Sequence, residues 1–77
     1  MAGGGSAVTV DLKDYDVLVV MKGPIFLRGM YAGDKVARWT SSAYEAWSTG
    51  SGLQAQKVAD KLGGVVRTFN RITGQVR

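Results

Sequence analysis

The chain has 77 residues with ten Lys/Arg, six Asp/Glu, no cysteine and no histidine, which gives a formal net charge of +4. The missing cysteine excludes disulfides and thiolate chemistry, and the missing histidine excludes the commonest metal ligand and general base. A chain of this length forms one domain, and we expect it to be a non-enzymatic protein without cofactor or metal ion.

The N-terminal residues show no targeting or membrane signal. Residues 1–6, Met-Ala-Gly-Gly-Gly-Ser, lack the basic and apolar regions of a signal peptide, so we expect a flexible tail or a cloning remnant. The longest uninterrupted apolar run is Val17–Met21, whereas a membrane-spanning helix needs about 20 apolar residues. We expect residues 7–77 to form a single domain in the cytoplasm, with no membrane partner.

The first half of the chain is expected to form strands joined by short turns. The expected strands are, in chain order, Ala7–Leu12, Tyr15–Met21, Ile25–Tyr31 and Val36–Thr40. The second strand is apolar on both faces, which favours a central position in the sheet. In the third strand, strict alternation would place Phe26, Arg28 and Met30 on one face. The short connections between consecutive strands predict an antiparallel meander.

Two segments follow that differ in how clearly they are defined. Residues 42–47 form either one helical turn, because Ser42 and Glu45 have capping-box spacing, or an irregular crossing anchored by Trp47. Ser51–Gly64 reads as a complete helix with an apolar stripe, and its two final glycines end it. Its start predicts a capping box between Ser51 and Gln54. The stripe consists of Ala55, Val58, Ala59 and Leu62.

The last part of the chain completes the expected fold. Val65–Phe69 is predicted as a strand, and residues 70–77 either extend it or turn at 73–74 into a last short strand. The fold class is therefore α+β, with an antiparallel four- to five-stranded sheet and one main helix packed on one face. Because one helix covers one face, we expect the second face to stay partly open and to receive a partner.

Two local patterns suggest chemistry that we interpret as structural. Asp11, Asp14 and Asp16 lie close together, but they lack the glycine and the distal glutamate of a calcium loop. A solvated strand junction explains them better than a metal site. Residues 50–52, Gly-Ser-Gly, precede a helix but lack the Gly-Lys-Ser/Thr ending of a phosphate-binding loop. Helix capping explains them better than a cofactor site.

The positive charge is unevenly distributed along the chain. From residue 48 onward there are five Lys/Arg against Asp60 alone, whereas residues 1–47 are balanced. This asymmetry is a hint of an acidic partner, although ordinary solvated surface charge also explains it. Arg67, Phe69 and Arg71 would share a strand face, an arrangement that binds single-stranded nucleic acid through stacking and phosphate contacts. The opposing interpretation is that the aromatic residues are simply core.

The aromatic and basic residues together give the candidate partner-binding set. Tryptophan, tyrosine and arginine dominate the binding energy of many protein interfaces. The set consists of Phe26, Arg28, Met30, Arg38, Trp39, Tyr44, Trp47, Lys57, Lys61, Arg67, Phe69 and Arg71.

The order of motifs across about Val17–Phe69 resembles small orphan proteins of phages and prophages. The shared pattern is a strand, Lys-Gly, a strand, Arg-Trp-Thr, Ala-x-x-Ala-Trp, and then a helix that ends in Leu-Gly-Gly before a returning strand. The resemblance implies that host-directed inhibitors, anti-CRISPR proteins among them, are a class to consider, and it transfers no functional residue.

These observations lead to two functional expectations. The first is a non-enzymatic protein-binding module, as a phage-encoded inhibitor of a host protein or ribonucleoprotein complex involved in defence. The alternative is a small basic nucleic-acid-binding domain that uses a sheet face with arginine and aromatic residues. A homodimer formed through the open sheet face is compatible with either expectation.

Overall fold

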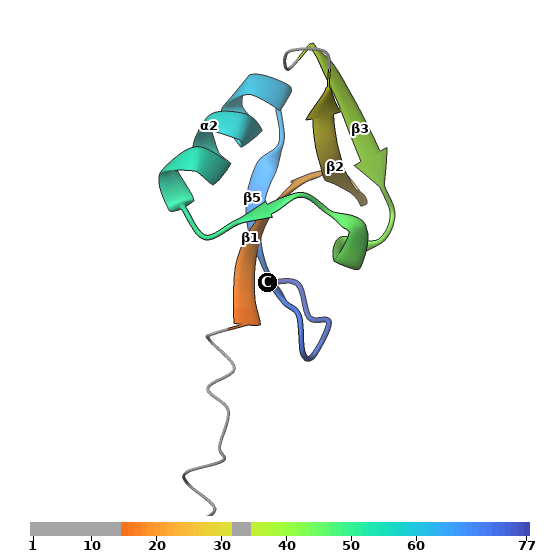
Figure 1. Ribbon diagram of the computed structural model, residues 1–77, viewed down its shortest axis with the longest axis vertical. Helices are drawn as coiled ribbons and strands as arrows, with labels where there is room; N and C mark the ends of the chain where they lie inside the picture. Colours follow the sequence, from red (N-terminus) through yellow and green to blue (C-terminus); the bar gives the residue numbers. More distant parts are fainter. Residues whose placement is uncertain (1–14, 32–34) are drawn as a thin grey trace, which may run out of the picture.

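The computed structural model describes residues 15–31 and 35–77, which form an antiparallel sheet with one helix packed against it (Figure 1). The predicted α+β class is confirmed. The predicted tail at 1–6 and the predicted strand at 7–12 lie outside the described residues. The elements are β1 (Asp16–Lys22), β2 (Ile25–Tyr31), β3 (Val36–Thr40), the 3-10 helix η2 (Ala43–Glu45), β4 (Ser48–Thr49), α2 (Gly52–Leu62) and β5 (Val65–Asn70).

Strand β1 is the centre of the sheet, as its apolar sequence predicts. One edge of β1 pairs with β5 from Asp16 to Met21. The other edge pairs with β4 near Leu18 and with β2 near Met21. Val19 and Val20 are fully buried, and because side chains alternate along a strand they face opposite sides of the sheet. Each face therefore has its own apolar core.

A β-bulge in the β2–β3 hairpin changes which residues share a face. Leu27 pairs with Trp39, but the next pair is Gly29 with Arg38, so Arg28 is the extra residue. The extra residue reverses the alternation beyond it. Met30 therefore joins Leu27 on the side of the helix. The prediction that Phe26, Arg28 and Met30 share a face is wrong for this reason.

Helix α2 begins and ends close to the expected residues, but only half of the predicted capping box forms. The Ser51 hydroxyl accepts a hydrogen bond from the Gln54 amide at 3.2 Å. The Ser51 amide instead donates to the Thr49 hydroxyl at 3.1 Å, and that hydroxyl donates to the Gln54 side chain at 3.0 Å. The helix ends at Gly63, whose φ of 71° lies in the left-handed region.

The helix packs on one face of the sheet through its alanine-containing stripe. Ala55 and Ala59 are buried, and Ala59 packs with Val20 and Leu27. Just after the helix, Gly64 lies so close to β1 that a Cβ atom there would be 2.7 Å from the Met21 carbonyl oxygen. Partly buried side chains complete this core: Met30, Ala37, Trp39, Trp47, Val58, Leu62 and Val66.

The second face was expected to stay partly open, and the chain itself covers its centre. Val19, Phe26 and Phe69 form its buried core, with Ala43 and Ala46 packed over them. The segment 71–77 adds a second cover by turning back along β5. The backbone N–H of Asn70 donates to the backbone carbonyl of Gln75 at 2.9 Å, and Phe69 and Val76 form an isolated β-bridge. The chain therefore turns back after β5, over residues 71–73, and meets that strand again at a single bridge instead of forming the expected last short strand.

Candidate partner-binding surface

The two phenylalanines of the predicted set are core residues. Phe26 is 7% exposed and Phe69 is 2% exposed, and both pack in the core of the second face. They are buried because η2 and the C-terminal turn cover that face, a packing that the strand pattern did not reveal. Neither ring is available to stack on a base or to enter a partner. The opposing interpretation of these two residues as core was the right one.

Three further candidates pack mainly into the helix-side core. Trp39, Trp47 and Met30 are partly buried there against Val20 and Leu27. The Trp47 amide also donates to the Leu27 carbonyl at 2.8 Å, which fixes the chain as it leaves η2. The segment 42–47 thus combines both expected features, a short helical turn and a tryptophan anchor. These side chains stabilise the fold and present little surface to a partner.

The remaining basic candidates lie on different sides of the molecule. Lys57 and Lys61 are exposed on α2, whereas Arg28 and Arg38 are exposed on the β2–β3 hairpin. Helix α2 and the hairpin lie on opposite sides of the view in Figure 1, with β1 and β5 between them. Arg67 lies opposite Val19, so it belongs to the second face, away from the helix. One flat partner surface could not contact all of these residues.

The hairpin carries a compact group that the sequence did not single out. The guanidinium of Arg38 lies 5.6 Å from the centre of the Tyr31 ring. The ring lies back over Gly29, where a Cβ atom would be 3.3 Å from the Tyr31 hydroxyl. Tyr31 and its cross-strand partner Val36 are 50% and 46% exposed. We call Tyr31, Val36 and Arg38 the hairpin patch.

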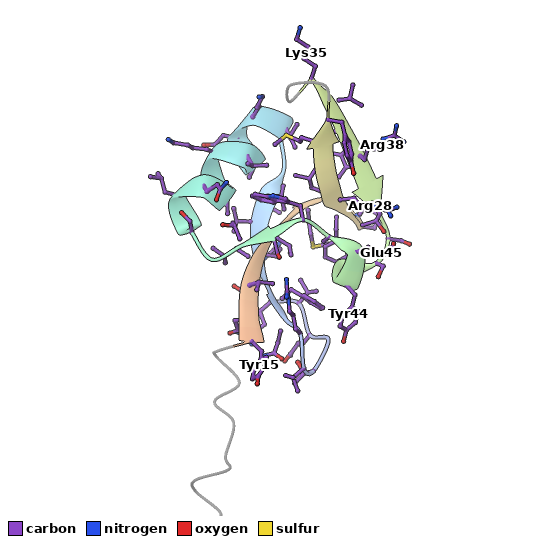
Figure 2. The ribbon with its side chains drawn as sticks, in the orientation of Figure 1. Tyr15, Arg28, Lys35, Arg38, Tyr44 and Glu45 are labelled. Carbon is purple, nitrogen blue, oxygen red and sulfur yellow. The ribbon has the colours of Figure 1, made fainter. Side chains whose placement is uncertain are left out.

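The bulge residue adds a second arginine beside the hairpin patch. Arg28 is exposed, and Figure 2 shows Arg28 and Arg38 projecting on the same side of the hairpin. Neither arginine has an ion pair among the described residues. Strand β3 pairs with β2 along one edge. Its other edge pairs with none of the described strands. Within the described residues, the hairpin therefore offers two unpaired positive charges next to a free strand edge.

Each acidic side chain of the described residues has a hydrogen-bond partner, and none of them forms an ion pair with Arg28 or Arg38. Asp16 accepts from Asn70 at 2.8 Å and forms a salt bridge of 2.6 Å with Arg77. Glu45 accepts from the Thr40 hydroxyl at 2.8 Å, and Asp60 accepts from Gln56 at 2.8 Å. In residues 15–31 and 35–77, no group of three or more ligands could hold a metal ion. Asp11 and Asp14 of the acidic cluster lie outside these residues.

A small open pocket of about 220 Å³ lies on the second face beside η2. Val17, Ala43, Ala46 and Phe69 supply its apolar lining, and Tyr44, Ser48 and Arg71 supply its polar groups. The Tyr44 ring meets Phe69 edge-on at 5.0 Å between centroids. Three members of the predicted set are thus brought together, and Tyr44 is far in the sequence from the other two, Phe69 and Arg71. No sequence signal predicted the pocket, because its walls come from four separate segments.

Comparisons with protein-family models, with curated proteins and with solved structures each found no match. No helix in the described part of the chain is long and apolar enough to cross a bilayer.

Proposed function

We propose that the protein is a non-enzymatic binding module that recognises an acidic protein surface through the hairpin patch and Arg28. The observation that carries the proposal is the exposed group of Tyr31, Val36 and Arg38, whose positive charge no acidic side chain of the described residues neutralises. Tyrosine and arginine are the residue types that most often supply the binding energy of protein interfaces. Gly29 leaves room for the Tyr31 ring to lie against the strand, beside Arg38. A ring that already lies there before binding would lose little side-chain freedom.

The edge of β3, which is free among the described strands, supports a protein partner. An edge strand presents backbone N–H and C=O groups that another extended chain can pair with. Arg38 lies on this strand, so a partner strand added here would pass beside its guanidinium. An acidic residue on the incoming strand would then be positioned for a charge-assisted hydrogen bond.

A nucleic-acid partner is the alternative, and it is less well supported. Phe26 and Phe69, the two rings expected to stack on bases, are buried. The exposed arginines could still contact phosphates, and binding of that kind would weaken steeply as salt concentration rises. Arginine contacts without stacking rings would give little of the affinity that single-strand binding proteins obtain from their bases.

The proposed partner class is a host protein or ribonucleoprotein complex in the cytoplasm, where the protein would act as an inhibitor. The support for this part is the resemblance of the motif order across Val17–Phe69 to small phage proteins. The second copy of a homodimer is a further occupant that the same surface could accept.

A capture experiment from bacterial lysate tests the proposal. Tagged protein is compared with the Tyr31→Ala variant, each before and after nuclease treatment. We expect one protein to be recovered in stoichiometric amount, to resist nuclease, and to be reduced at least about tenfold by Tyr31→Ala, which removes the aromatic anchor. Recovery that nuclease abolishes would instead support the nucleic-acid alternative. A dimer seen by light scattering, with no captured protein, would contradict a foreign partner.

A further inference from the structure

The pocket beside η2 combines an apolar floor with a positively charged rim. Val17 and Phe69 come from the paired strands β1 and β5, and Ala43 and Ala46 come from the segment that crosses over them. Arg71 is the charged residue among the described lining residues, and none of them is acidic. The pocket therefore favours a ligand that is apolar at one end and anionic at the other.

Two hydrogen-bond donors are held together at this rim. An Nη atom of Arg71 donates to the Ser48 hydroxyl oxygen at 2.9 Å. Because that oxygen accepts from Arg71, the Ser48 hydroxyl hydrogen is directed elsewhere, and it makes no hydrogen bond to the described residues. The guanidinium also keeps further N–H donors, since Ser48 is its side-chain partner. A guanidinium and a hydroxyl placed side by side match the two oxygens of a carboxylate.

The volume of the pocket indicates whether its ligand is a free small molecule or a single amino-acid residue. The pocket holds about 220 Å³, whereas sites for drug-sized ligands and cofactors have about 300–1,000 Å³. An open pocket of this size suits one side chain together with the carboxylate of the same residue. Only the last residue of a polypeptide carries a backbone carboxylate beside an apolar side chain.

We propose that the pocket captures the C-terminal residue of a partner polypeptide. Its apolar side chain packs on the partly buried Val17 and Ala46, and its carboxylate accepts hydrogen bonds from Arg71 and Ser48. The Tyr44 ring, held edge-on to Phe69, forms the outer wall. The proposal rests on the proposed protein-binding function, because its ligand is the end of a protein chain. It adds a second contact point, separate from the hairpin patch, and states the chemistry of the group that is bound there.

The probes for this proposal are acetylated tetrapeptides, Gly-Ser-Gly-Leu with a free carboxylate and the same sequence with a C-terminal amide. Binding to the 77-residue protein is followed by amide chemical-shift changes in NMR spectra. We expect the free acid to shift Ser48, Phe69 and Arg71 in a saturable way, and the amide to bind at least about tenfold more weakly. A third peptide, amidated Gly-Glu-Gly, carries its carboxylate on a side chain and should bind as weakly as the amide.

Variants assign the effect to the pocket. Arg71→Gln should reduce binding of the free acid to the level of the amide, and Arg71→Lys should retain only part of the affinity because it lacks the planar pair of donors. Arg67→Gln removes the same charge from the same face without touching the pocket, and it should bind like the unmodified protein. The spectra of the variants also report whether each remains folded.

Four results would overturn the proposal. The first three are equal shifts with acid and amide, no shifts with either, and unchanged binding by both Arg71 variants. The fourth is equal binding of the Glu peptide, because the pocket would then accept any carboxylate. These outcomes leave the hairpin proposal intact, since no peptide probe depends on Tyr31. Conversely, capture that is insensitive to Tyr31→Ala, together with selective binding of the free acid, would refute the hairpin patch alone.

Discussion

Arg38 and Tyr31 lie on the same face of the β2–β3 hairpin and contact each other there. They share this face because of the β-bulge between Leu27 and Gly29. The guanidinium of Arg38 lies 5.6 Å from the centre of the Tyr31 ring. If residues 27–31 alternated regularly, without a bulge, Tyr31 would face the same side as Leu27, toward the helix. The bulge instead places the ring on the face opposite the helix, over Gly29. The exposed patch is therefore a consequence of one irregular residue.

The contact depends on the missing side chain at Gly29. A Cβ atom there would be 3.3 Å from the Tyr31 hydroxyl, so the ring would have to give way slightly, and a larger side chain would push it further. We expect Gly29→Val to preserve the fold, since valine suits a strand, and to separate Arg38 from Tyr31. Side-chain protons of Arg38 that lie over the ring should lose their upfield NMR shift. Unchanged Arg38 shifts in a folded variant would show that Gly29 does not position the ring.

The close approach of Gly64 to β1 predicts a strong effect of one methyl group. A Cβ atom at Gly64 would be 2.7 Å from the Met21 carbonyl oxygen and 2.9 Å from a Val20 methyl group. We expect Gly64→Ala to lower the free energy of unfolding by about 1–3 kcal/mol, because the backbone must move to relieve the overlap. Urea unfolding followed by circular dichroism measures the change.

The Gly52→Ala variant controls for the loss of backbone flexibility that any change from glycine to alanine causes. At Gly52, the first residue of α2, a Cβ atom would have no neighbouring atom of the described residues within 4 Å, so alanine fits there. We expect Gly52→Ala to leave stability unchanged or to raise it by up to about 1 kcal/mol, because alanine favours a helix more than glycine does. If both variants had the same stability, the close packing at Gly64 would be refuted.

The start of α2 is held by Thr49 in addition to Ser51. The Thr49 hydroxyl accepts from the Ser51 amide at 3.1 Å and donates to Gln54 at 3.0 Å. Thr49→Val keeps the shape of the side chain and removes both hydrogen bonds, so we expect a loss of about 0.5–2 kcal/mol, similar to the loss of a helix cap. Hydrogen exchange at the Ser51 amide should become faster. A reciprocal capping box, with Gln54 bonded to the Ser51 amide, would leave that exchange rate unchanged.

Asn70 connects the C-terminal turn to β1. It is buried, donates to Asp16 at 2.8 Å, and accepts from the amides of Ile72 and Thr73 at 2.9 Å each. We expect Asn70→Ala to cost about 1–3 kcal/mol, because these partners lose their hydrogen bonds. The effect should be largest on hydrogen exchange at Gly74 and Arg77, whose amides donate to the carbonyls of Asn70 and Thr68. Uniform acceleration throughout the protein would indicate that the turn does not open separately.

Much of the fold could be predicted from local sequence, and the candidate surface could not. The apolar run of β1, the stripe of α2 and the paired glycines after it each specify one element through nearby residues. The face on which Met30 and Tyr31 lie depends on a bulge, and its one local sign in the sequence is Gly29 inside the strand. The burial of Phe69 depends on η2 and Val76, which reach it only in the folded chain. Local periodicity therefore identified the elements and failed where distant segments cover a face.

The most direct test of the proposed binding surface compares two double variants. Each one loses two positive charges, either from the hairpin or from α2. Arg28→Ala with Arg38→Ala alters the hairpin, and Lys57→Ala with Lys61→Ala alters α2 by the same net charge. The affinity of each double variant for the captured partner is measured by calorimetry. We predict at least about a tenfold loss for the arginine variant and less than about a twofold change for the lysine variant. Equal losses, or a loss confined to the lysine variant, would contradict the hairpin as the binding surface.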